Sequence, residues 1–495
     1  MCGQSDKKDL KRRAQPFFYN CSSIIIGKSA STTGKVVLAH NEDDRDAVSQ
    51  QMIVPRRKHP EGETLRFGDG NAVIPQVRET YAYYWSEIRS RTWKASSADT
   101  FVNEWGVAVA SDSCVPCKED VSDPQTGGMI YGLRRLIAER SRTAREGVEV
   151  AVDLIEKYGY DSSRSYQICD KDEGWVLQIA RGRHYAAERV PDDEVFYIPN
   201  WYTIHGIDFA DTKHETYYFS DDLAGYAAER GWYVPKRPGE DSDFDFAKAY
   251  QGGEDRPANL LRARGAWRLL LGGEPGDLKR FSAKLGRKIG PEDAKKVMRS
   301  HYEGTPDDVT DHYAVNPHRD PKRHFTICNA MTVESCIVQF NETPALTCIW
   351  RAALTPCVSP YVPWYLGITK APYGYGWQDP RTAQATHFDP SESDVRYHPQ
   401  RAFWAFKTLK YLTDFDYKGT HGTIWESVRK LEEKWDAEQE GVQKIYRELF
   451  AKNPDTAAEF LNGYTGAQAR LAWDWANDMI QRLGEAKALE NSTDK

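Results

Sequence analysis

The sequence predicts a mixed α/β fold built in layers, because short β-rich runs alternate with segments of helical spacing. The chain has 495 residues, which allows one large domain or two. Hydrophobic residues make up 40% and charged residues 28%, a globular composition with enough apolar material for a buried core. A net charge of −7 argues against nucleic acid as a partner, and no run of about 18 apolar residues predicts a membrane span.

The first 20 residues form a polar segment with five Lys or Arg against two Asp. They contain no apolar core of a secretory signal, so we expect residues 1–20 to be a leader, a pro-segment or a tether. The run Cys2-Gly3-Gln4-Ser5 would suit the stub of a bacterial lipoprotein. This slightly favours an extracytoplasmic location, secreted or lipid-tethered, over the cytoplasm.

From Cys21 onward the chain becomes strand-like. Residues 22–26 and 35–39 predict a hairpin, because the loop between them is rich in Gly, Ser and Thr. Further strands are expected at 106–110, 165–169, 175–180, 326–328, 335–340 and 347–350, and helices at 129–158, 256–271 and 291–302.

The last hundred residues instead carry apolar side chains at three- and four-residue spacing, as in Ile424, Val428 and Leu431. We therefore expect one main domain over 21–390 and a helical extension over 391–495 that packs on it.

The motif content narrows the chemistry. The sequence contains no GxSxG, HExxH, GxxxxGK[ST] or GxGxxG, which leaves cysteine chemistry or none. Nine cysteines in 495 residues are too few for a disulfide scaffold. Cys114 and Cys117 form a single CxxC motif, which is a weak signal for zinc and is better explained as a loop feature or a local disulfide. Cys21 stands out: as a new N-terminus, it would supply a thiol nucleophile together with an α-amine base. The alternative is an inert buried strand cysteine.

Ordered landmarks along the chain resemble the cysteine dipeptidase family of N-terminal-nucleophile hydrolases, relatives of penicillin V acylases and bile salt hydrolases. They begin with the segment 21–34 and Ala39-His40-Asn41-Glu42-Asp43, and continue through Asn103-Glu104-Trp105-Gly106-Val107, Val190-Pro191-Asp192-Asp193, His301-Tyr302-Glu303-Gly304-Thr305, Thr332-Val333-Glu334-Ser335 and residues 361–367. The resemblance implies an α+β fold, the four-layer αββα sandwich of this class, with a C-terminal helical extension.

The resemblance also implies the site. Cys21 matches the nucleophile, and Asp43 matches an aspartate that orients its amino group. Asn200 matches an oxyanion-hole donor, and either Arg262 or Arg264 matches an active-site arginine. His40 stands where an arginine often occurs, so its interaction with the thiolate is an open question.

The implied activity is hydrolysis of dipeptides through a thioester at Cys21, with no cofactor and no metal, so that activity should survive EDTA and vanish with iodoacetamide. Small dipeptides are the expected partners, with a possible homo-oligomer. The alternatives are an N-acyl amide hydrolase with the same chemistry, or an inactive binding protein on the same scaffold. A glutamine amidotransferase with Cys2 as nucleophile is disfavoured, because the residues after Cys2 are charged and not strand-like.

Overall fold

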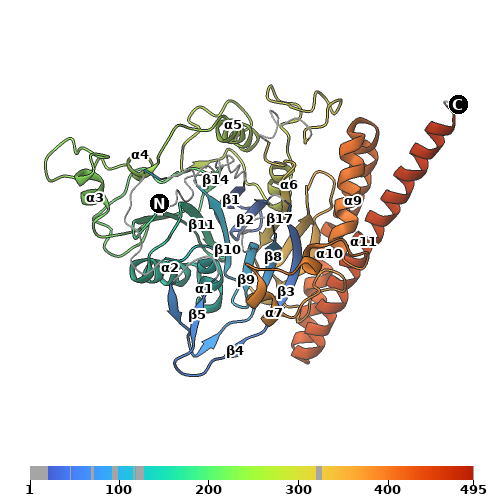
Figure 1. The fold of residues 1–495 in the computed structure, drawn as a ribbon, viewed down its shortest axis with the longest axis horizontal. Helices are drawn as coiled ribbons and strands as arrows, with labels where there is room; N and C mark the ends of the chain where they lie inside the picture. Colours follow the sequence, from blue (N-terminus) through green and yellow to red (C-terminus); the bar gives the residue numbers. More distant parts are fainter. Residues whose placement is uncertain are drawn as a thin grey trace, which may run out of the picture.

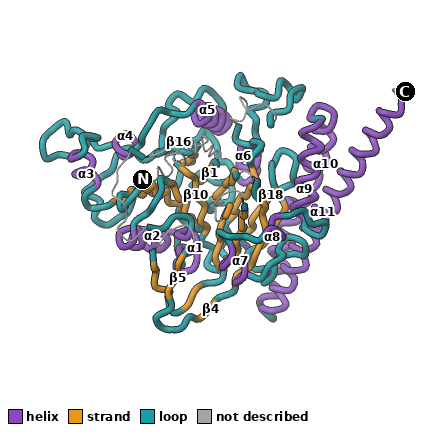
Figure 2. The backbone as a smooth tube through the Cα atoms, in the orientation of Figure 1, coloured by secondary structure: helices purple, strands orange, loops and turns teal. Residues whose placement is uncertain are grey.

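The computed structural model describes residues 21–44, 46–67, 72–91, 98–114, 117–118, 128–318 and 326–493. Two large antiparallel sheets dominate this part of the chain (Figures 1 and 2). The first has seven strands in the order β16-β14-β1-β2-β17-β18-β19. Their bounds are β16 (Ser282–Lys284), β14 (Glu194–Ile198), β1 (Ser22–Ile26), β2 (Val37–Asp43), β17 (Thr332–Gln339), β18 (Cys348–Ala353) and β19 (Val362–Tyr365).

The second sheet has eight strands in the order β15-β13-β12-β11-β10-β9-β8-β3. They are β15 (Tyr217–Phe219), β13 (Tyr185–Arg189), β12 (Gly174–Ile179), β11 (Arg164–Cys169), β10 (Ala108–Ser113), β9 (Ala98–Asn103), β8 (Tyr83–Arg89) and β3 (Val48–Val54). Two short hairpin-like pairs, β4 (Arg57–Lys58) with β7 (Glu79–Thr80) and β5 (Thr64–Arg66) with β6 (Val73–Pro75), extend from it.

Helices cover the outer face of each sheet. α1 (Gly132–Arg140) packs on β9 and β10, and α2 (Ala144–Tyr158) packs on β11 and β12. α5 (Pro257–Leu271) packs on β14, and α6 (Pro291–Met298) packs on β2 and β17. The inner faces of the two sheets contact each other through strand pairs such as β1 with β10 and β2 with β9. The architecture is therefore the expected αββα sandwich (Figure 1).

Three long helices lie along one side of the sandwich, drawn in orange to red in Figure 1. They are α9 (Ala402–Phe415), α10 (Tyr417–Phe450) and α11 (Pro454–Thr493). α10 and α11 contact β19, α9 contacts β3, and Ile424, Val428 and Trp435 are fully buried in the same core as the first sheet. Short helices complete the described chain: α3 (Leu223–Glu229), α4 (Phe246–Tyr250), α7 (Pro380–Thr386), α8 (Glu392–Val395) and a 3₁₀ turn at Pro344–Leu346. Among the described residues, no helix is both long and apolar enough to cross a bilayer.

The structure corrects three sequence predictions. The helix expected over 129–158 is two helices, because Thr143 caps α2 by accepting a hydrogen bond from the Glu146 N–H, and Asn103 Nδ2 donates to the carbonyls of Ala138 and Ser141 at the junction. Residues 326–328 form bends rather than a strand. The helix expected over 291–302 ends four residues earlier, at Met298.

Candidate active site

Cys21 lies directly before β1, an inner strand paired with β14 on one side and β2 on the other. Ser22 pairs with Asn41 in antiparallel register, so Cys21 meets the last residues of β2, Glu42 and Asp43. Ile24, Ile25 and Ile26 are completely buried, because both faces of this strand are covered. The same burial fixes the position of Cys21, whose exposure is 3%.

The thiol of Cys21 lies among acidic side chains. Its Sγ is 3.5 Å from Glu42 Oε1, and the backbone N–H of Asp43 donates to it over 3.5 Å. Burial raises the pKa of the Cys21 thiol well above its usual range, and the charges of Glu42, Asp43 and Asp112 raise it further. The thiol is therefore protonated at neutral pH, and its ionisation requires a base.

Arg262, on α5, connects the start of β1 to the end of β14. Its Nη1 donates to the Cys21 carbonyl oxygen at 2.6 Å and to Ser22 Oγ at 3.1 Å. Its Nη2 donates to Asn200 Oδ1 at 2.7 Å and to Asn259 Oδ1 at 2.9 Å. Nη2 also donates to the Pro199 carbonyl oxygen at 3.1 Å, so this fully buried guanidinium holds two backbone and three side-chain oxygens in fixed positions.

Asn200 follows β14 and has a φ of 69°, a left-handed conformation that asparagine tolerates better than most residues. Its Nδ2 donates to the carbonyl oxygen of Ser113 at 2.7 Å, while its Oδ1 accepts from Arg262. An amide nitrogen carries two N–H groups, so a second donor is available to a ligand.

Asp43 ends β2 with its carboxylate held by two neutral donors. Thr332 Oγ1 donates to Oδ1 at 2.6 Å, and Asn329 Nδ2 donates to Oδ2. Burial raises the pKa of Asp43 to about 7, although both hydrogen bonds oppose that rise.

His40 is fully buried between two carboxylates of the second sheet. Its Nδ1 bonds Asp99 Oδ1 at 2.6 Å, and its Nε2 is 3.8 Å from Asp112 Oδ1. Burial alone would lower its pKa, but Asp99, with Asp112 and Glu42, raises the pKa to about 9. His40 is therefore positively charged at neutral pH, with a ring nitrogen within 4.8 Å of Cys21 Sγ.

A comparison with models of known protein families decides the family, because the model of "Peptidase family C69" matches residues 20–430. The chain belongs to peptidase family C69. Among its relatives, a probable dipeptidase B of Streptococcus pyogenes serotype M3 is 24% identical over 96% of this chain and 93% of that protein. Dipeptidase A of Lactobacillus helveticus is 25% identical over 80% of this chain and 82% of its own length.

Among solved structures, penicillin V acylase from Agrobacterium tumefaciens matches 67% of this chain and 82% of its own, with 11% identity and a TM-score of 0.33. The family match and the dipeptidase relatives confirm the resemblance to the dipeptidase family seen in the sequence, so the protein is a peptidase, an enzyme that hydrolyses peptide bonds.

One of the two candidate arginines of this peptidase lies away from Cys21. Arg264 forms ion pairs with Asp307, at 2.7 Å from Nη2 and 3.0 Å from Nε, and its side chain is 42% exposed. Of the arginine candidates, the structure brings only Arg262 together with Cys21 and Asn200.

Four side chains that surround the candidate site were not predicted from the sequence: Glu42, Asp99, Asp112 and Asn259. Each is almost fully buried, with exposures between 0% and 3%. A signal was present for Glu42, because His40-Asn41-Glu42-Asp43 is a run of polar residues that ends a strand between two others. Such a run is costly in a sheet interior unless it serves a site.

Tyr83, Tyr84 and Trp85 of β8 are buried in the core, because both faces of this strand are covered. Cys2 and the rest of residues 1–20 lie outside the described part of the chain. Within the described part, Cys21, His40 and Asp112 offer three ligand atoms within 4.8 Å of one another that could hold a cation. Catalytic zinc sites also have three protein ligands, and retention of activity in EDTA would exclude that role here.

Proposed function

We propose that this C69 peptidase is a dipeptidase whose nucleophile is Cys21, exposed as an N-terminus after removal of residues 1–20. The observation that carries the proposal is the buried group formed by Cys21, Asp43, Asn200 and Arg262, directly before the inner strand β1. The dipeptidase names of the relatives from Streptococcus pyogenes and Lactobacillus helveticus support the substrate class.

The α-amine of Cys21 is the proposed base. His40 is a poor acceptor for the thiol proton, since it is already protonated at neutral pH. A free amine, with an ordinary pKa of about 7.7–8.0, can take that proton, and the resulting ammonium favours the thiolate by its charge. The protonated His40 adds a second positive charge near the sulfur, in place of the arginine common at this position in related enzymes.

The reaction then proceeds in two steps. The thiolate attacks the scissile carbonyl, Asn200 donates its second amide N–H to the oxyanion, and the ammonium returns its proton to the leaving amine. The thioester that remains is hydrolysed by water, with the amine again acting as base. Asp43 holds the amine, and Arg262 fixes Asn200 and the Cys21 carbonyl.

The test is labelling with iodoacetamide during an assay with dipeptides and N-acylated amino acids. We expect hydrolysis of dipeptides with a free amino terminus, and loss of activity in proportion to alkylation of Cys21 as mapped by mass spectrometry. Hydrolysis of N-acylated amino acids alone would refute the substrate class, and full activity with Cys21 alkylated would refute the nucleophile.

A further inference from the structure

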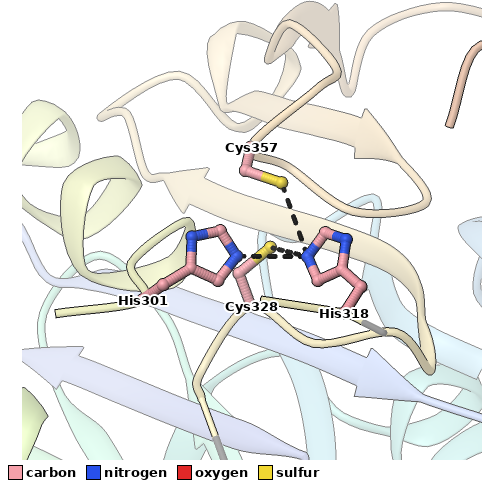
Figure 3. Close-up of side chains that lie close together, drawn as sticks. All are labelled: His301, His318, Cys328 and Cys357. Carbon is pink, nitrogen blue, oxygen red and sulfur yellow. Dashed lines mark hydrogen bonds between the residues drawn. The ribbon is translucent and has the colours of Figure 1, made fainter. Parts of the chain in front are cut away.

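A second cluster of reactive side chains lies outside the site described above. His301, His318, Cys328 and Cys357 are all buried, and one ligand atom of each lies within 4.8 Å of the others. Figure 3 shows both imidazole rings and both thiols pointing toward a common centre from separate segments of the chain. We propose that these four residues bind one zinc ion.

The distances match a tetrahedral site. His301 Nε2 and His318 Nε2 are 3.1 Å apart, while Cys357 Sγ and Cys328 Sγ lie 3.7 and 4.0 Å from His318 Nε2. Zinc–nitrogen bonds of about 2.0–2.1 Å and zinc–sulfur bonds of about 2.3 Å place the ligand atoms of a tetrahedron roughly 3.3–3.8 Å apart. The observed separations bracket this range, so small shifts of the side chains bring all four atoms into bonding distance.

The outer nitrogens of both rings are oriented by carboxylates. His301 Nδ1 lies 2.8 Å from Glu303 Oε1, and His318 Nδ1 lies 2.8 Å from Asp414 Oδ1 on α9. A carboxylate there fixes the proton on Nδ1 and turns the Nε2 lone pair inward, the arrangement found around zinc-binding histidines. In two neutral rings of this kind, the lone pairs of His301 Nε2 and His318 Nε2 would face each other over 3.1 Å and repel. A cation bound by both nitrogens would remove this repulsion.

The ligand chemistry selects zinc. Two thiolates and two imidazoles are a common structural zinc set, and the two thiolate charges neutralise the ion within the protein. Iron–sulfur clusters with two histidines and two cysteines place these pairs on different irons, which needs wider separations than this cluster shows. Because four protein ligands leave no open position, the ion is structural and does not act on substrate.

The proposed ion would connect the peptidase core to the helical extension. Its ligands come from the segment after α6, the turn before β17 and the loop after β18, and Asp414 adds α9. Next to Cys328, Asn329 donates to the Asp43 carboxylate. The site therefore supports the loop that holds Asp43, although the sequence analysis expected no metal in this protein.

The test measures metal in the full-length protein purified under reducing conditions from zinc-containing medium. We expect about one zinc per chain by plasma mass spectrometry in the wild type. The same zinc content is expected in two control variants, Cys348→Ala and Cys21→Ala. Cys348 is a buried cysteine of β18 that lies outside the cluster. Cys328→Ser and His301→Asn should each lower zinc content at least about tenfold.

Cobalt replacement keeps the proposal testable if those variants do not fold. Wild-type protein produced with Co²⁺ should show thiolate-to-cobalt charge transfer and the visible bands of a tetrahedral ion. Absence of stoichiometric zinc, iron in its place, a Cys328–Cys357 disulfide in reduced preparations, or zinc lost with Cys21→Ala but retained in Cys328→Ser would each overturn the assignment.

Discussion

Arg262 and Arg264 show how two residues of the same type, two positions apart on one helix, have different environments. At about 100° per residue they point roughly 200° apart, so only one can face the sheet. Arg262 is buried against Cys21 and Asn200, whereas Arg264 binds Asp307 near the surface. Sequence spacing could predict an arginine on this helix but not which one, since the choice depends on the rotation of α5 against β14.

Arg262→Lys should lower kcat on dipeptides by on the order of 10²-fold, because an ammonium cannot hold the Cys21 carbonyl and Asn200 at once. Arg264→Lys is the matched control and should keep kcat within a few-fold. The test is to measure kcat on dipeptides by steady-state kinetics for both variants, after their thermal stability has been checked. Equal kcat values for the two variants would contradict the assignment of Arg262.

Cys21→Ala should fold but lose peptidase activity, and Cys21→Ser should retain at most a trace, because a hydroxyl is the weaker nucleophile. Cys2→Ala should be nearly silent. Turnover of a dipeptide by Cys21→Ala at the wild-type rate would exclude Cys21 as nucleophile.

His40 predicts a pH dependence of stability. Its pKa is about 9 in the folded protein against about 6.5 when unfolded, so its ion pairs contribute fully below pH 6.5 and are lost as the pH rises through 9. The free energy of unfolding should therefore decrease as the pH rises from about 6.5 to about 9, and it should decrease less in His40→Gln. Denaturant titrations at both pH values test this, with the 89%-exposed His312 changed to Gln as control. The same slope in wild type and His40→Gln would contradict a charged His40.

At the scale of elements, hydrophobic patterning predicted β1 at Ser22–Ile26 and α5 within one residue, because both have clear start signals and strongly apolar interiors. It missed the break at Arg140–Ala144, since apolar spacing continues across it and the cap at Thr143 decides the boundary. The histidines and cysteines of the proposed zinc site carried no signal, because they come from three segments without short metal-binding spacing.

The position of α5 depends on close contact at Gly265, where an added Cβ would lie 2.1 Å from Tyr302 Cε1. Gly265→Ala should therefore destabilise the protein by about 1–3 kcal/mol and reduce activity, since α5 carries Arg262. Gly463→Ala, in α11 with no atom within 4 Å of its Cβ, should instead stabilise by roughly 0.5–1 kcal/mol. Urea denaturation compares them, and equal stabilities would show that α5 is not held by this contact.

At the scale of the whole molecule, the layered fold was predictable from family landmarks, but the environment of the thiol was not. Cys21 is surrounded by Glu42, Asp43 and Asp112, which belong to two different sheets and raise its pKa. Carboxylates are usually on the surface, so the burial of Asp112 beside a strand of the other sheet could be seen only once the two sheets were placed face to face. Ionising the thiol in this acidic surrounding requires a base beside the charge of His40, and the proposed base is the α-amine freed from residue 20.

The most direct test of this account is to measure dipeptidase activity alongside intact mass in fractions of the wild-type protein. A peptide nitrogen is not a usable base, so activity should follow the fraction of chains that begin at Cys21, and Cys21→Ala should keep residues 1–20 if processing is autocatalytic. Full activity from chains that retain residues 1–20 would contradict the required removal of the leader.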